Sequence, residues 1–228
     1  MNELLQNIKV EVPEGLYVKN PESSELGKKI IQYSITLLDE IGFEKFNFKK
    51  LGKLIGSNES SIYRYFESKH KLLSYLCSWY WRWLEYLIII ETHKIVDTKE
   101  KLLKTIEVVT RTRKEDNDFS HINEILLNKI VIHENSKTFL TKNVDDKNKE
   151  GFFLPYKQVV RRLANCISDY NSEYKFALSL SSAVTVGALH QHFFTSHFAT
   201  ITDCGGQVTP TQFYTDLILK TLTNSNER

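Results

Sequence analysis

Apolar residues recur every three or four positions over most of this 228-residue chain, and this spacing constrains the fold more than any other feature. Residues at such intervals share one face of an α-helix. Only nine glycines and four prolines interrupt the chain, and strand-like alternation is largely limited to its first residues. The sequence therefore predicts an all-α fold. The clearest apolar stripe, with steps of 4, 3, 4, 4 and 3 positions, is Leu72, Leu76, Trp79, Trp83, Leu87 and Ile90.

Capping residues divide the pattern into successive helices. Ser24 is a good N-cap and Gly42 a good left-handed C-cap, which predicts a first helix between them. Gly56 is expected to close the second helix, and Ser68 to cap the long helix that carries the apolar stripe. A loop is expected at 141–151. The other expected helices are at about 48–55, 59–66, 97–113, from Asp118 or Ser120 to 134, 153–170, 173–198 and 209–222.

Composition argues against membrane proteins and disulfide frameworks. Hydrophobic residues make up 41% of the chain and charged residues 25%, as in soluble globular proteins. The longest apolar-rich stretch is interrupted by Arg82 and Glu85, so it falls short of the roughly 20 uncharged residues of a membrane span. Cys77, Cys166 and Cys204 lack the spacing of a disulfide framework or a zinc site. We therefore expect a cytoplasmic protein with packed, reduced thiols and no membrane segment.

Two short predicted helices, joined by the turn Gly56-Ser57-Asn58-Glu59, form a helix-turn-helix. Ile62 and Phe66 stand four residues apart and are expected to turn inward, so the side chains between them must face mainly outward. The second helix thus presents a surface. Its expected inward partners are Leu51, Leu54 and Ile55, and its outward residues are Glu59, Ser60, Ser61, Tyr63, Arg64 and Tyr65.

Positive charge is concentrated around this module. Residues 45–71 hold seven Lys or Arg and two acidic residues, a local excess of five positive charges, whereas the whole chain carries a net charge of +2. A basic patch on one short module is typical of a duplex-binding surface. A solvated charged face is the alternative for the lysines taken alone. Together with the helix-turn-helix spacing, the charge favours DNA binding.

The sequence of residues 46–73, FNFKKLGKLIGSNESSIYRYFESKHKLL, resembles the DNA-binding signature of TetR/AcrR-type transcriptional repressors. In that signature a helix ends at a glycine, the helix after the turn ends in aromatic-x-x-Phe, and a lysine opens a long fourth helix. Tyr63, Phe66 and Lys69 match it in type and spacing, and two leucines follow. The resemblance covers about residues 24–75. Departures at Gly52, Ile55, Ser57 and Ser60 leave the operator sequence undetermined.

The resemblance implies DNA contacts for nine residues. Tyr63 and Tyr65 would contact phosphates or base edges, and Lys69 would hold a backbone phosphate where the helix dipole also favours an anion. Arg64 is suited either to reading guanine or to an exposed salt bridge, and Glu59 either to accepting from cytosine or to complementing the helix dipole. The predicted DNA-binding residues are Lys49, Asn58, Glu59, Ser60, Ser61, Tyr63, Arg64, Tyr65 and Lys69.

The resemblance also implies three segments: an N-terminal arm at 1–23, a DNA-binding domain at 24–75, and an effector-binding and dimerisation domain at 76–228. The arm holds four glutamates and two lysines, so we expect it to pack on the protein. The expected partners are double-stranded DNA and a second copy of the chain, bound through the helices near 153–170 and 173–198. A small apolar or aromatic effector of unknown identity is expected beside Phe119, Ile122 and Leu126.

The C-terminal part carries no catalytic signature of the common types, so we expect no enzyme and no cofactor. The local histidine group, His190, His192 and His197, is expected to be structural, because 190 and 197 stand about 10 Å apart along a helix. Three functions remain open. They are a ligand-responsive homodimeric repressor of a near-palindromic operator, a regulator without an effector, and an interaction module or enzyme that has lost DNA binding.

Overall fold

The structure, a computed structural model, describes residues 10–112 and 121–223, and helices make up its regular structure. Within these residues, β structure is limited to an isolated bridge between Gly205 and Val208, so the all-α prediction is confirmed. No helix in the described ranges has the length and apolar character needed to cross a bilayer. The elements are η1 (Glu14–Leu16), η2 (Pro21–Ser23), α2 (Glu25–Lys45), α3 (Phe48–Leu54), α4 (Glu59–Tyr63), α5 (Lys69–Thr92), α6 (Thr98–Thr110), α7 (Glu124–Glu134), α8 (Ser136–Phe139), α9 (Val144–Lys149), α10 (Leu154–Tyr170), α11 (Ala177–His197), η3 (Ala199–Ile201) and α12 (Pro210–Thr223).

The described chain forms two compact units. Residues 10–82 and 121–154 belong to the first unit, and residues 83–112 and 155–223 to the second. The boundary between them falls inside α5, so this helix contributes residues to both. The division into a DNA-binding domain at 24–75 and a C-terminal domain at 76–228 concerns function and stays a prediction.

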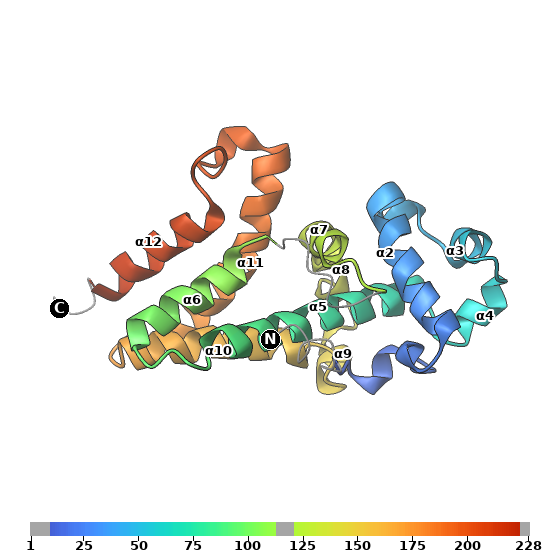
Figure 1. The fold of residues 1–228 in the computed structure, drawn as a ribbon, viewed down its shortest axis with the longest axis horizontal. Helices are drawn as coiled ribbons and strands as arrows, with labels where there is room; N and C mark the ends of the chain where they lie inside the picture. The colour runs from blue at the N-terminus through green and yellow to red at the C-terminus, as the bar shows by residue number, and fades with distance from the viewer. Residues whose placement is uncertain (1–9, 113–120, 224–228) are drawn as a thin grey trace. The chain divides into compact units, whose positions relative to one another are not determined.

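In the first unit, α2 packs against η2, α3 and α7, and α3 packs against α4 (Figure 1). Ser24 caps α2 as expected, because its Oγ accepts a hydrogen bond from the backbone N–H of Gly27 at 3.2 Å. Gly42 takes the left-handed backbone conformation, with φ of 70°, but the helix resumes after it and ends at Lys45. Gly42 therefore interrupts α2 with a kink and ends the regular helix that begins after Ser24, as predicted, and a short helical segment follows it to Lys45.

In the second unit, α6, α11 and α12 pack together, and α10 adds apolar side chains to the same core. Arg162 on α10 forms an ion pair with the buried carboxylate of Glu85 on α5, at 2.8 Å. His192 bonds to the backbone oxygen of Thr110 at 2.7 Å, and burial lowers its pKa. The core residues are Leu102, Ile106, Leu163, Cys166, Ile167, Val184, Ala188, Tyr214, Ile218 and Leu222.

The predicted stripe of α5 is buried from Leu72 to Leu87, while Ile90 is half-buried. Other faces of the helix are buried as well, and several of their polar groups are bonded, whereas the buried hydroxyl of Ser78 has no hydrogen-bond partner among the described residues. The indole Nε1 of Trp81 donates to Asn135 Oδ1 at 3.1 Å, and Asn128 Nδ2 donates to the hydroxyl of Tyr80 at 3.0 Å. The aromatic side chains of α5 are thus mainly core residues.

Several expected boundaries differ from the observed ones. The helix expected at 59–66 ends at Tyr63, and the loop expected at 141–151 contains α9. The helix expected from 173 begins at Ala177. α7 begins at Glu124, capped by Asn123, and the expected starts at Asp118 or Ser120 lie outside the described residues, as does the expected end of a helix at 113.

The described part of the N-terminal arm, residues 10–23, packs on the first unit as expected. Val10 and Leu16 are buried. The backbone N–H of Val18 donates to the carbonyl oxygen of Tyr65 at 2.8 Å, and Lys71 Nζ donates to the carbonyl oxygen of Gly15 at 2.7 Å. Residues 1–9 of the arm lie outside the described residues. All three cysteines are free and buried.

Candidate nucleic-acid interface

The helix-turn-helix begins with α3 and a tight turn. Asn47 caps α3 by accepting a hydrogen bond from the N–H of Lys50 at 2.9 Å. The N–H of Ser57 then donates to the carbonyl oxygen of Gly52 at 2.8 Å. A Cβ at Gly52 would lie 2.9 Å from the carbonyl oxygen of Ser57, closer than such atoms normally approach. The glycine, one of the departures from the TetR/AcrR pattern, therefore lets the turn close tightly against α3.

The recognition helix of this motif, α4, is held by its cap and by one buried side chain. The Oδ1 of Asn58 accepts hydrogen bonds from both the N–H and the hydroxyl of Ser61, each at 2.8 Å. Ile62 is fully buried. A helix of five residues does not persist on its own, so this packing fixes its position. Asn58 and Ser61 thus serve the helix cap, in addition to their predicted contacts with DNA.

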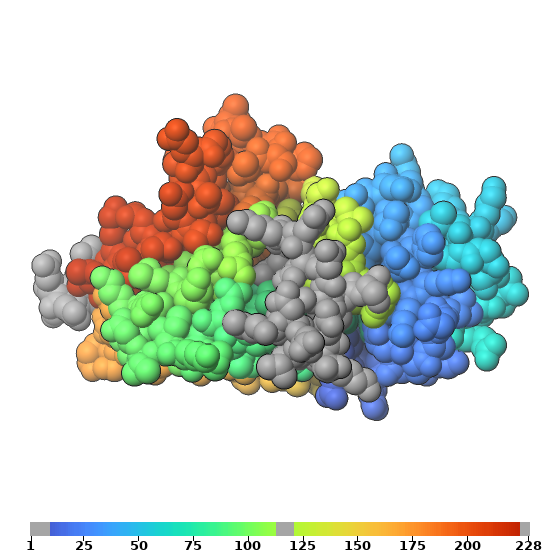
Figure 2. Space-filling model, viewed as in Figure 1, coloured from blue at the N-terminus to red at the C-terminus, as the bar shows by residue number. Residues whose placement is uncertain are grey.

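Tyr63 is 48% exposed and meets the expectation of an outward side chain. Its ring contacts Phe48 edge-on with centroids 5.0 Å apart, and its hydroxyl donates to Glu59 Oε1 at 3.4 Å. These contacts hold one side of the ring and leave the remainder open to a partner. Ser60 and Arg64 are exposed beside it. Figure 2 shows side chains of this part of the chain, in cyan, projecting from the molecular surface.

The outward orientation predicted for Tyr65 is wrong. Its ring is buried, and its hydroxyl shares a hydrogen bond of 2.8 Å with Ser24, the cap of α2. This bond lowers the pKa of the Tyr65 phenol, and Lys19, with its ammonium 5.2 Å from the ring centroid, lowers it further. The physical reason is that α4 ends at Tyr63, so the chain turns and carries Tyr65 inward with Phe66.

Lys69 opens α5 as expected, but its ammonium is engaged with the protein. Its Nζ donates to the carbonyl oxygen of Phe43 at 3.0 Å and lies 3.3 Å from those of Glu44 and Phe46. It also lies 4.5 Å from the centre of the Phe43 ring. Lys69 therefore ties the end of α2 to the start of α5. Its predicted contact with a DNA phosphate stays a prediction.

Fewer cations are open to solvent around the helix-turn-helix than the seven that the sequence places between residues 45 and 71. Lys69 and Lys71 are half-buried and donate to backbone carbonyl groups of the protein, so they add less to the open surface. The other five cations are exposed. They are Lys45, Lys49, Lys50 and Lys53 around α3, and Arg64 at the end of α4. Of these, Lys50 also donates to the carbonyl oxygen of Lys45 at 2.8 Å.

The structure brings part of the predicted site together. Exposed Ser60 and Tyr63 lie on α4 and exposed Arg64 is its C-cap, and exposed Lys49 lies on the adjoining α3. Glu59 is half-buried at the first turn of α4. Among the expected core residues, Leu51, Ile62 and Phe66 are buried, whereas Leu54 is 47% exposed. Leu54 is therefore a surface residue of α3.

Two features of the site were missed by sequence reasoning. Phe48, at the first position of α3, supports the ring of Tyr63, and the arm reaches the end of α4 through Val18 and Tyr65. Phe48 is a large apolar residue at the start of the first helix of the motif, so the sequence could have indicated that it is buried there. Val18 and Tyr65, which are 47 positions apart, are joined by a backbone hydrogen bond. Side-chain patterns in a sequence do not predict such a bond.

The chain is similar to a known protein family in sequence and to several solved structures in fold. Residues 30–76 match the family described as "Bacterial regulatory proteins, tetR family". No curated protein sequence matches the chain. Three similar solved structures cover most of it. They are the TetR family transcriptional regulator PfmR from Thermus thermophilus (TM-score 0.55, 16% identity, 84% of this chain and 97% of that chain), the fatty acid degradation regulator FadR from Bacillus halodurans (0.57, 15%, 90% and 96%), and AibR in complex with isovaleryl coenzyme A and operator DNA (0.52, 14%, 84% and 96%).

These identities are low, so the structural matches establish the fold alone, and the sequence match shows that the segment containing the helix-turn-helix is similar to the tetR family. Both agree with the resemblance carried by Tyr63, Phe66 and Lys69. Residues 30–76 are therefore similar to the TetR family of bacterial regulatory proteins, and the chain has the fold of TetR-family transcriptional regulators.

Proposed function

We propose that the protein is a ligand-responsive, homodimeric repressor that binds a near-palindromic operator in the major groove of DNA. The observation that carries this proposal is the division of α4 into two sides. Ile62 is buried, while Ser60, Tyr63 and Arg64 are exposed next to the cations of α3. Arginine recognises guanine, and the hydroxyl groups of serine and tyrosine contact phosphates or base edges.

Binding to a specific operator is tested by incubating sheared genomic DNA with the purified protein and sequencing the fragments that the protein retains. We expect enrichment of one near-palindromic sequence whose half-sites are separated by about one duplex turn, ~35 Å. Affinity for the enriched fragment should fall steeply between low and physiological salt, because phosphate contacts release counterions. Absence of duplex binding at every salt concentration would contradict the proposal and favour an interaction module or an enzyme on this fold.

The homodimer is proposed to form through α10 and α11. Apolar residues lie on all sides of α11, yet only one face is buried in the chain, and Leu178 is 60% exposed. A groove of about 370 Å³ runs between the two helices. Helices that are apolar all round are normally covered on every side, so a second copy would cover the outer face. The groove is lined by Tyr156, Lys157, Val160, Arg161, Leu178, Ser179 and Ser182.

Replacing Leu178 by a charged residue should dissociate the dimer. We expect Leu178→Glu to shift the molar mass measured by light scattering at micromolar concentration from that of a dimer towards that of a monomer, because a carboxylate would lose water in the interface. Val96→Glu is the matched control, since Val96 is 94% exposed outside these helices. A monomeric wild-type protein, or equal effects of the two substitutions, would contradict the proposed interface.

The effector is proposed to be a small apolar or aromatic molecule bound by the C-terminal part of the chain. AibR was solved with isovaleryl coenzyme A and operator DNA, which supports an effector for a protein of this fold. Near the expected position, Ile122 is buried and Leu126 half-buried, while Phe119 lies outside the described residues. A ligand that distinguishes two states of α5 by about 100-fold would contribute about 2.7 kcal/mol, enough to weaken operator binding strongly.

A further inference from the structure

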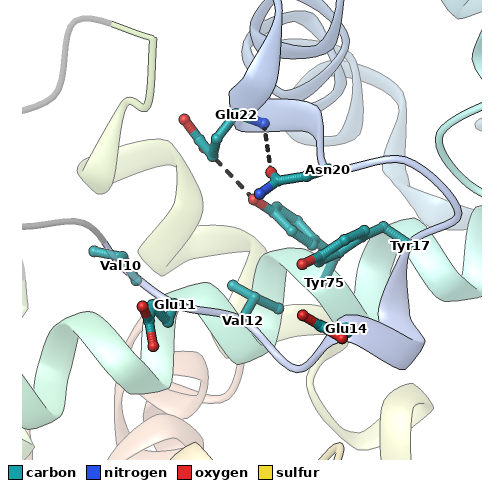
Figure 3. Close-up of a pocket in the computed structure, with 8 residues that line it drawn as sticks. All are labelled: Val10, Glu11, Val12, Glu14, Tyr17, Asn20, Glu22 and Tyr75. Carbon is teal, nitrogen blue, oxygen red and sulfur yellow. Dashed lines mark hydrogen bonds between the residues drawn. The ribbon is translucent and has the colours of Figure 1, made fainter.

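The N-terminal arm encloses a cavity of about 210 Å³ against the first half of α5 (Figure 3). Val10, Glu11 and Val12 lie on one side of it and Asn20 and Glu22 on the other, with two tyrosine rings between them. All of these residues belong to the first unit of the chain. The described residues that line the cavity are Val10, Glu11, Val12, Glu14, Tyr17, Asn20, Glu22 and Tyr75.

The walls of this arm cavity are rich in carboxylates. Among the described residues, Glu11 and Glu14 have no ion-pair partner within 4 Å, whereas Glu22 pairs with Nε2 of His121 at 2.9 Å. The pKa of Tyr17 is raised by burial and then by the charges of Glu14 and Glu11, as expected beside concentrated negative charge. The cavity therefore favours a positively charged occupant.

The cations that approach the arm do so mainly through its backbone. Lys71 Nζ donates to the carbonyl oxygen of Gly15 and lies 4.2 Å from the centre of the Phe152 ring. Arg82 Nε donates to the carbonyl oxygen of Glu11 at 3.4 Å. Among the described residues, the charged side chains that line the cavity are those of Glu11, Glu14 and Glu22, and the first two are exposed at its mouth.

Two aromatic rings complete the site. Tyr17 and Tyr75 meet edge-on, with centroids 6.1 Å apart and planes at 74°. Tyr75 is only 2% exposed, and its hydroxyl lies 3.5 Å from Glu22 Oε1, at the limit of hydrogen bonding. Aromatic faces together with carboxylates are the groups that bind ammonium ions in proteins. No group of three or more metal-ligating side chains that could hold an ion occurs among the described residues, which disfavours a metal.

We propose that the arm cavity binds a small organic cation, a substituted ammonium ion, between Tyr17, Tyr75 and the carboxylates of Glu11, Glu14 and Glu22. Its volume is that of about seven water molecules at their liquid density, which suits an ammonium head with a short substituent. The site lies apart from the expected C-terminal effector and does not depend on DNA binding. A bound cation would hold the arm against α5, since both contribute to the walls.

The site is tested by titrating the full-length protein, without DNA, with choline and with its uncharged carbon isostere dimethylbutanol in a calorimeter. We expect choline to bind and the neutral isostere to bind at least about fivefold more weakly, because the two differ only in charge. Equal binding of the two compounds would overturn the proposal, as would absence of choline binding up to about 10 mM.

Two pairs of variants localise the binding. Glu14→Gln should weaken choline binding up to about fivefold, whereas Glu40→Gln, the same change at an exposed position of α2, should leave it unchanged. Tyr17→Leu should weaken it by about fivefold, whereas Tyr17→Phe, which keeps the ring, should retain it. The proposal would be overturned if Glu14→Gln and Glu40→Gln changed the affinity for choline equally, or if Tyr17→Leu and Tyr17→Phe did so. Circular dichroism checks that each variant is folded.

Discussion

Phe66→Ala is expected to lower the free energy of unfolding by about 3–5 kcal/mol, the usual cost of removing a buried aromatic side chain. Phe66 is fully buried, its N–H donates to the carbonyl oxygen of Ile62 at 3.1 Å, and its ring meets Tyr75 of α5 with centroids 5.3 Å apart. The substitution would therefore leave a cavity where the end of the recognition motif joins α5. Denaturant unfolding followed by circular dichroism measures the loss.

Leu54→Ala is the matched control, because it also removes a large apolar side chain from the helix-turn-helix. Leu54 is 47% exposed, so we expect it to cost less than about 1 kcal/mol. Similar losses for the two variants would contradict the observed division between inward and outward residues of the motif. Since that division exposes Ser60, Tyr63 and Arg64, the proposed DNA-binding surface would then lose its main support.

The double substitution Lys49→Gln, Lys53→Gln is expected to weaken duplex binding by about 60-fold at 0.1 M salt. Both lysines are exposed on α3. Each phosphate that a lysine no longer neutralises makes the negative slope of log K against log salt shallower by about 0.9, so two such phosphates make it shallower by about 1.8. If the wild type and the double variant bind DNA equally near 1 M salt, a slope difference of about 1.8 makes the variant about 60-fold weaker at 0.1 M salt. Fluorescence anisotropy with a labelled duplex over a salt series measures both quantities.

Lys94→Gln, Lys99→Gln makes the same change in net charge at two exposed lysines far along the chain from α3. The salt slope of this control should equal that of the wild type, because its lysines lie outside the proposed interface. Equal slopes for all three proteins would show that α3 does not contact phosphates. Unfolding curves should be alike for both double variants, since surface substitutions of this kind usually change stability by less than about 0.5 kcal/mol.

The helices themselves were predicted well because the signals for them are local. Ser24, Asn58 and Asp97 cap α2, α4 and α6 through hydrogen bonds to N–H groups three residues ahead. The apolar spacing of α5 likewise depends only on the pitch of the helix. A single sequence therefore determines where these helices begin and which face of each is apolar.

Other properties of the site required the tertiary structure. Tyr65 is held inside by Ser24, 41 positions away, and the ammonium of Lys69 is held by the carbonyl of Phe43, 26 positions away. The arm cavity arises in the same way, from residues 10–22 packed against Tyr75. Helical spacing fixes which residues lie on the same face but not which distant segment covers that face. The sequence by itself thus determined the capped helices and the helix-turn-helix motif, and contacts between distant segments decided which side chains of that motif remain exposed.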